Sequence, residues 1–148
     1  MNIEIVVGSV LGASEYVAEA LEQTLQDEHT VKYHFQPTVE AVNFDNLLIV
    51  VTSTHGAGDL PDNIQAFADH LSELNLSKLQ ALVIGLGDSS YDTFCEGASK
   101  MAQVIEKANG KLLLPIFQID VLHHPIPEDI AVNWLQKNLS YVVSQFNS

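Results

Sequence analysis

The sequence has no arginine, and its six lysines are outnumbered by 19 aspartates and glutamates, so the formal net charge of the 148 residues is −13. This balance argues against nucleic-acid binding, because phosphate contacts need a basic patch, and an anionic membrane surface would repel the chain. A chain this acidic favours a basic-surfaced protein partner that is attracted over long range. High charge also keeps proteins soluble without any partner, so composition alone leaves both explanations open.

Cysteine and long hydrophobic runs are also scarce. Cys95 is the only cysteine, which excludes an internal disulfide and a metal site made of cysteines. No apolar run approaches the roughly 20 residues needed to cross a bilayer, and the N-terminal residues lack the pattern of a secretory signal. We therefore expect a cytoplasmic protein without a metal site. With 47% hydrophobic residues, the chain is long enough for one core and too short for two ordinary domains, so residues 1–148 are predicted to form a single domain.

Short apolar runs alternate with segments of helical periodicity along the whole chain. The predicted strands are Ile3–Val7, Val31–Phe35, Leu47–Val51, Ala81–Leu86 and a fifth within Lys111–Asp120 that is interrupted at Pro115. The predicted helices are Glu15–Gln26, one that follows Pro61, one from about Glu96 to Ala108, and one that follows Pro127. This alternation predicts an α/β protein with a parallel sheet and helices on both of its faces.

Three of the apolar runs lead into loops of small, hydroxyl-bearing and acidic residues, which we call the first loop (residues 8–14), the second loop (52–59) and the third loop (87–95). Loops at the carboxyl ends of neighbouring strands meet in one crevice, where open α/β sheets bind ligands. None of the three contains Lys or Arg, so a phosphate in this crevice must be held by backbone N–H groups and hydroxyls. Taken alone, the first loop is also typical of an ordinary turn before a helix.

Together the three loops resemble those of short-chain flavodoxins. The phrases Ser-Thr-His-Gly-Ala-Gly-Asp (53–59) and Tyr-Asp-Thr-Phe-Cys (91–95) are most similar to the MioC-type FMN-binding proteins, and the resemblance covers about residues 3–146. It implies a flavodoxin-like, doubly wound, five-stranded parallel sheet in the order 2-1-3-4-5, with FMN bound non-covalently at its carboxyl edge.

The same resemblance implies a set of FMN-binding residues. They are Ser9, Val10, Leu11, Gly12, Ala13 and Ser14 at the phosphate, Ser53, Thr54, His55 and Gly56 with Leu86, Gly87, Asp88, Tyr91, Asp92, Phe94 and Cys95 around the isoalloxazine, and Asp120 near the ring.

This chain departs from the family pattern at three of those positions. Leu11 and Ala13 stand where the family often has threonine, so two hydroxyl contacts to phosphate are lost. Backbone amides must then supply most of the hydrogen bonds to the phosphate. His55 stands where an aromatic residue often flanks the ring. Stacking on the ring and a hydrogen bond at its edge both remain open for this histidine.

The leading functional hypothesis is an electron carrier in which FMN does the redox chemistry and the protein controls binding and access. We expect transient partners with basic surfaces, a reductase and an acceptor enzyme, and the resemblance to MioC-type proteins suggests an acceptor such as biotin synthase. Acidic residues near the crevice would disfavour negative charge on the reduced flavin and form a docking rim. They are Glu15, Asp59, Asp62, Asp88, Asp92, Glu96 and Asp120. For Glu15, Asp62 and Glu96, which stand at the starts of predicted helices, complementing the helix dipole is the favoured explanation.

Two other hypotheses belong to different classes. An FMN-dependent NAD(P)H oxidoreductase acting on quinones would need a second pocket for nicotinamide, and the sequence offers no Arg for an adenosine phosphate. A flavin-free interaction module such as a receiver domain would need an acidic cluster after the first strand and an Asp at the end of the third. Here those strands end in Val7-Gly8 and Val51-Thr52, which argues against a receiver.

Overall fold

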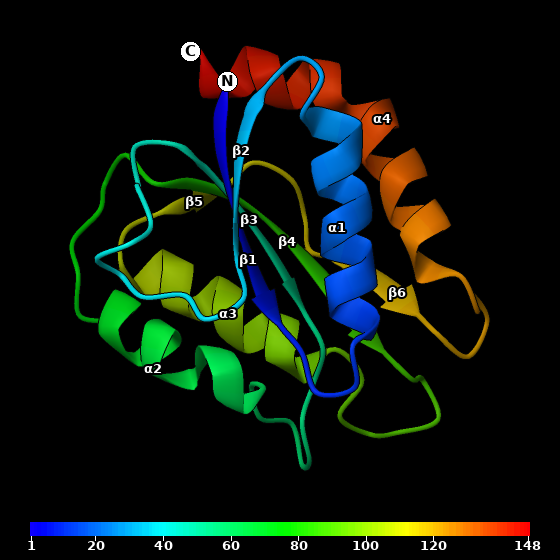
Figure 1. The fold of residues 1–148 in the computed structure, drawn as a ribbon. Coiled ribbons are helices and arrows are strands. Elements are labelled where there is room, and N and C mark those ends of the chain that lie inside the picture. The colour runs from blue at the N-terminus through cyan, green and yellow to red at the C-terminus, as the bar shows by residue number, and fades with distance from the viewer.

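A computed structural model describes all 148 residues and shows a parallel sheet between two layers of helices (Figure 1). The strands are β1 (Asn2–Gly8), β2 (Thr30–His34), β3 (Leu47–Thr52), β4 (Gln80–Gly87), β5 (Lys111–Leu112) and β6 (Phe117–Asp120). The sheet runs in the order β2-β1-β3-β4-β5, β6 also pairs with β4, and every pairing is parallel. The predicted order of five strand positions is therefore confirmed.

The fifth position of the sheet is filled by two short strands instead of one. β5 pairs with the beginning of β4 through Gln80 and Ala81, and β6 pairs with its end, from Ile84 to Gly87. Pro115 lies between them, and a proline cannot donate a ladder hydrogen bond. The predicted interruption is confirmed, and β6 brings Asp120 beside Gly87 at the carboxyl edge of the sheet.

The helices are α1 (Ala13–Leu25), α2 (Asp62–Leu71), α3 (Glu96–Lys107) and α4 (Pro127–Phe146). Two apolar clusters fill the space between helices and sheet, one under α1 and α4 and the other under α2 and α3 (Figure 1). Along β1, Ile5 and Val7 belong to the first cluster and Val6 to the second. Coverage on both faces explains why the central strands are almost wholly apolar. None of the four helices is both long and apolar enough to span a membrane.

The segment Gln36–Asn46, whose sequence shows no clear periodicity, is tied to the sheet by a buried carboxylate. Glu4 on β1 is 1% exposed, and its Oε1 lies 2.9 Å from His34 Nε2 and accepts from the Asn43 N–H at 3.3 Å. Its Oε2 accepts from Asn46 Nδ2 at 3.1 Å. One side chain of β1 thus holds two residues of this segment, Asn43 and Asn46.

Replacing Glu4 with alanine is expected to lower the free energy of unfolding by about 2–3 kcal/mol, because the donors around it would lose their common acceptor inside the protein. Glu4→Gln keeps an acceptor oxygen and the side-chain volume, so its loss of unfolding free energy should be less than half of that in Glu4→Ala. Urea unfolding followed by circular dichroism measures both. Equal losses in the two variants would show that the negative charge of Glu4 matters more than its hydrogen bonds.

Candidate functional site

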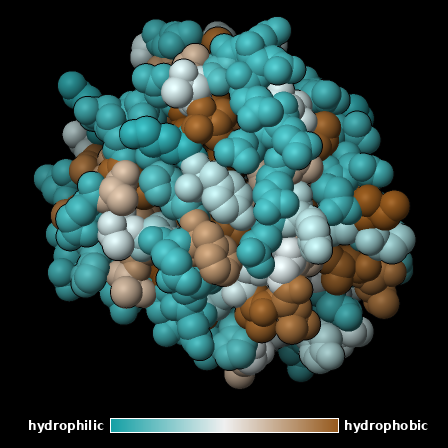
Figure 2. All heavy atoms as spheres, in the orientation of Figure 1, coloured by the Kyte–Doolittle hydropathy of each residue, from teal (hydrophilic) through white to brown (hydrophobic).

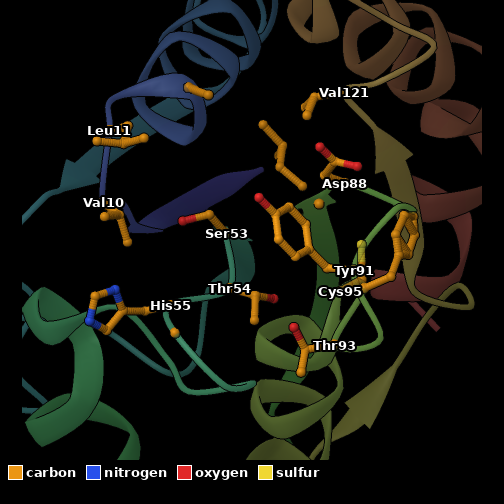
Figure 3. Close-up of a pocket in the computed structure, with 15 residues that line it drawn as sticks. Val10, Leu11, Ser53, Thr54, His55, Asp88, Tyr91, Thr93, Cys95 and Val121 are labelled. Carbon is orange, nitrogen blue, oxygen red and sulfur yellow. The ribbon is translucent and has the colours of Figure 1, made fainter.

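The three loops and the turn after β6 surround an open cavity of about 450 Å³ at the carboxyl edge of the sheet. Its size is typical of a cofactor or small-molecule site. Figure 3 shows Val10, Leu11 and His55 on one side of this cavity and Tyr91 and Val121 on the other. Most of the predicted site residues line it: Val10, Leu11, Ala13, Ser53, Thr54, His55, Gly56, Leu86, Gly87, Asp88, Tyr91, Phe94 and Cys95.

Five predicted residues do not line the cavity, namely Ser9, Gly12, Ser14, Asp92 and Asp120, and two lining residues, Thr93 and Val121, were missed. Thr93 lies inside the third loop, so its place in that loop could have suggested it. Val121 directly follows the fifth strand position, and the rule that ligands sit beyond the carboxyl ends of strands would have included it.

The first loop and the start of α1 form a site with unused hydrogen-bond donors. The backbone N–H groups of Val10, Leu11, Ala13 and Ser14 make no hydrogen bond within the protein. The Ser14 hydroxyl is buried and is the only buried side-chain polar atom without a partner. Gly12 makes the turn possible with a φ of 96°. Free amides at a helix N-terminus, together with an unsatisfied buried hydroxyl, are typical of a phosphate site.

Ser9 organises the same loop from within. Its hydroxyl accepts from the Gly12 N–H at 3.0 Å and donates to Glu15 Oε2 at 3.2 Å. Glu15 lies in the first turn of α1, where a carboxylate complements the helix dipole. The Ser9 side chain is thus already engaged inside the loop, unlike the Ser14 hydroxyl.

The second loop closes on itself through two reciprocal hydrogen bonds. The His55 N–H donates to the Asp59 carbonyl at 2.7 Å, and the Asp59 N–H donates to the His55 carbonyl at 2.8 Å. Between them Gly56 and Gly58 have positive φ angles of 54° and 100°. The peptide that joins Gly56 to Ala57 makes no hydrogen bond in the protein, so it can rotate without breaking one.

The third loop is braced by two carboxylates. Asp88 Oδ1 accepts from the N–H of Ser90 at 2.9 Å and from its hydroxyl at 2.6 Å. Asp120 Oδ1 accepts from the Ser89 N–H at 3.2 Å and from the Leu122 N–H at 3.1 Å. Hydrogen bonds from the Ser89 side chain and backbone lower the pKa of Asp120. Asp120, predicted near a bound ring, therefore ties the third loop to the turn that carries Val121.

Cys95 lines the cavity although its residue is fully buried. Burial, with a smaller contribution from the charge of Asp120, raises the pKa of its thiol to about 12. The left-handed backbone at this residue, with a φ of 54°, directs the chain into α3. The side chain is a neutral apolar wall and no nucleophile at neutral pH.

Cys95 is therefore expected to resist thiol reagents in the folded protein. A pKa that rises from 9.0 to about 12 leaves about a thousandfold less thiolate, which is the reactive form. Ellman's reagent at pH 8 should label the protein only after urea is added. Because the folded pKa is the higher one, this contribution to stability is complete below pH 9 and is lost as the pH rises towards 12. Rapid labelling of the native protein would contradict the description of Cys95 as a buried, neutral thiol.

The chain matches the family model of flavodoxins over residues 5–134. It belongs to the Flavodoxin family. The MioC homolog of Haemophilus influenzae is 40% identical to this flavodoxin over 139 residues, which are 91% of this chain and 94% of that protein. A mutant flavodoxin from Pseudomonas aeruginosa has 31% identity and a TM-score of 0.84, and the match covers 93% of this chain and 95% of that one.

A flavodoxin from Fusobacterium nucleatum, solved with flavin mononucleotide bound, shares only the fold with this one. Its identity is 16% and its TM-score 0.78, over 95% of this chain and 98% of that chain. The resemblance to MioC-type flavodoxins inferred from the loops is confirmed by the curated relatives.

The three positions at which this flavodoxin departs from the family pattern, Leu11, Ala13 and His55, all line the cavity. Leu11 is 94% exposed at the mouth of the cavity, and Ala13 is also exposed. Neither side chain can donate to a phosphate, so the free backbone amides and the Ser14 hydroxyl are the donors that this loop offers. His55 lies on the same side as Val10, across the cavity from Tyr91 (Figure 3).

Proposed function

We propose that this flavodoxin is an FMN-dependent electron carrier that passes electrons between protein partners. The observation that carries the proposal is the buried, unpartnered Ser14 hydroxyl at the start of α1, in a loop with free amides whose neighbouring residue Ala13 lines a cavity of suitable size. A buried donor without an acceptor is costly, and a bound phosphate would satisfy it. FMN, once bound, supplies a ring that accepts and donates electrons one at a time.

Each wall of the cavity has a separate task in this proposal. Ser14 and the amides of the first loop would hold the phosphate. Tyr91, whose side chain is largely exposed, offers a flat face for stacking with its hydroxyl in water. The free carbonyl of Gly56 in the second loop can accept a hydrogen bond from the ring edge. Cys95 and Leu86 close the inner side and keep water out.

The surface around the cavity suits a transient, basic-surfaced partner. Val10, Leu11, Tyr91 and Leu122 are exposed at or near its mouth. Figure 2 shows hydrophilic residues over most of this face and hydrophobic ones gathered at its lower end and right side, where Figure 1 places the loops after β1 and β6. An apolar centre within an acidic surface favours a partner with an apolar patch and a lysine- or arginine-rich rim.

On the donor side we propose a reductase, and on the acceptor side a reductively activated enzyme such as biotin synthase. The resemblance to MioC-type proteins supports this choice of acceptor. The net charge of −13 supports basic docking surfaces on both partners.

Titration of the flavin-free protein with FMN tests the cofactor, and we expect stoichiometric quenching of flavin fluorescence. Reduction by NADPH should then require an added flavoprotein reductase and should slow as salt screens the acidic surface. Failure to bind FMN would refute the proposal. Rapid oxidation of NADPH by the FMN-loaded protein alone would instead support an NAD(P)H oxidoreductase.

Ser14→Ala is expected to change flavin binding and stability in opposite directions. Loss of the hydroxyl should weaken FMN binding about tenfold, the effect of one hydrogen bond to a charged group. The flavin-free protein should become more stable by about 1 kcal/mol, because a buried donor without a partner is removed. Calorimetric titration and urea unfolding measure the two effects. Ser140→Ala on α4, distant in sequence from every loop of the site, is the control. A variant with unchanged FMN affinity would contradict the phosphate assignment.

A further inference from the structure

Asn63, in the first turn of α2, contacts three separate segments of the chain through one side-chain amide. Its Oδ1 accepts from the Ser9 N–H at 3.0 Å, and its Nδ2 donates to the Val7 carbonyl at 2.6 Å and to the Phe35 carbonyl at 2.8 Å. Both hydrogens of the amide nitrogen and the amide oxygen are thus used. The reversed orientation would place the oxygen against two carbonyls, so the contacts fix the side chain in one orientation.

The position of Asn63 explains why these three groups need it. The ladder between β1 and β2 ends at the pair Val6 and His34, so the carbonyls of Val7 and Phe35 lie just beyond that ladder, while β1 continues to pair with β3 through Gly8. α2 lies close to this point, since a Cβ at Gly8 would be 2.6 Å from Ile64 Cδ1. Asn63 therefore satisfies two carbonyls beyond the β1–β2 ladder and the Ser9 amide of the first loop together.

We propose that Asn63 is a positioning residue that fixes the first loop in the conformation that receives the phosphate, an inference that rests on the proposed function. The Ser9 N–H is bound to Asn63, while the next two amides, of Val10 and Leu11, have no partner in the protein. Anchoring the first peptide of the loop sets the direction of those that follow. The anchor carries unusual weight here because Leu11 and Ala13 supply no hydroxyl, so the phosphate depends on backbone geometry.

The test compares FMN with riboflavin, which lacks the phosphate, in the wild-type protein, Asn63→Ala and Asn63→Asp. Asn63→Ala should weaken FMN binding at least tenfold and riboflavin binding less than threefold, since the first loop would hold the phosphate and most residues around the ring belong to the other two loops. Asn63→Asp should be at least as damaging for FMN, because its carboxylate would face the two carbonyls and cannot donate to them. Gln65→Ala is the matched control. Gln65 on α2 also carries a side-chain amide. It donates to the Leu60 carbonyl at 2.9 Å and makes no hydrogen bond to the first loop.

Equal weakening of FMN and riboflavin in Asn63→Ala, or no weakening of either, would overturn the proposal. If wild-type protein bound FMN no better than riboflavin, the phosphate site itself would be refuted, which is a distinguishable result. Amide hydrogen exchange of the flavin-free wild type needs no variant. Ser9 should exchange at least tenfold more slowly than Val10 and Leu11, and equal rates at the three amides would overturn the proposal.

Discussion

Replacing Gly97 with valine is expected to weaken FMN binding by about one to two orders of magnitude, because α3 and the second loop are in contact at this residue. A Cβ at Gly97 would lie 2.5 Å from the Ser53 carbonyl oxygen and 3.3 Å from Thr54 Cα. The Gly97 N–H also donates to Thr54 Oγ1 at 2.9 Å. These contacts involve backbone atoms, so the side chain cannot be accommodated by a rotamer change. The second loop must move, and it forms one wall of the cavity.

Fluorescence titration with FMN and with riboflavin measures this effect. Both flavins should be affected, since the second loop faces the ring, in contrast to the phosphate-specific effect expected for Asn63→Ala. Gln103→Ala changes an exposed position of the same helix and should leave both affinities unchanged. Wild-type affinity in Gly97→Val would show that the second loop can move without cost to the site.

Phe67→Ala is expected to lower the free energy of unfolding by about 3–5 kcal/mol, a large fraction of the stability of a domain of this size. Phe67 on α2 is 1% exposed and packs in the cluster under α2 and α3. Its ring stacks on Phe44 with the ring centroids 6.2 Å apart. Truncation would leave a cavity in a layer that the surrounding helices cannot easily close.

Urea unfolding of the flavin-free protein measures the loss, and Phe67→Leu, which keeps most of the volume, should lose less than about 1.5 kcal/mol. At temperatures where Phe67→Ala remains folded, its FMN affinity should stay within a few-fold of wild type, because Phe67 does not line the cavity. A loss below about 1 kcal/mol would show that this layer relaxes around the missing ring.

The Gly97 and Phe67 predictions concern different parts of one architecture. Gly97 lies where α3 meets a loop of the site, so its substitution affects flavin binding directly. Phe67 lies in the apolar cluster between α2 and the sheet, where burial of apolar surface dominates the free energy of folding. Ser14 is intermediate, since its buried hydroxyl destabilises the flavin-free protein and would stabilise the complex.

The sequence by itself determined the parts of this protein that depend on local patterns. Alternating apolar runs and helical periods predicted the strands and helices, and Pro115 predicted the break at the fifth strand position. Because parallel strands must place their carboxyl ends together, the three loops were also expected in one crevice. These features follow from the side chains of neighbouring residues, which periodicity can detect.

Only the tertiary structure decided which polar side chains hold distant segments of the chain together. Asn63 holds Ser9 across 54 positions, Asp120 holds Ser89 across 31, and Glu4 holds Asn46 across 42. Each of these residues is an ordinary polar residue in its own segment, and its role depends on which groups the folded chain leaves without a partner. Buried donors and acceptors must be satisfied wherever the fold exposes them, so such contacts become evident only when distant segments are placed side by side.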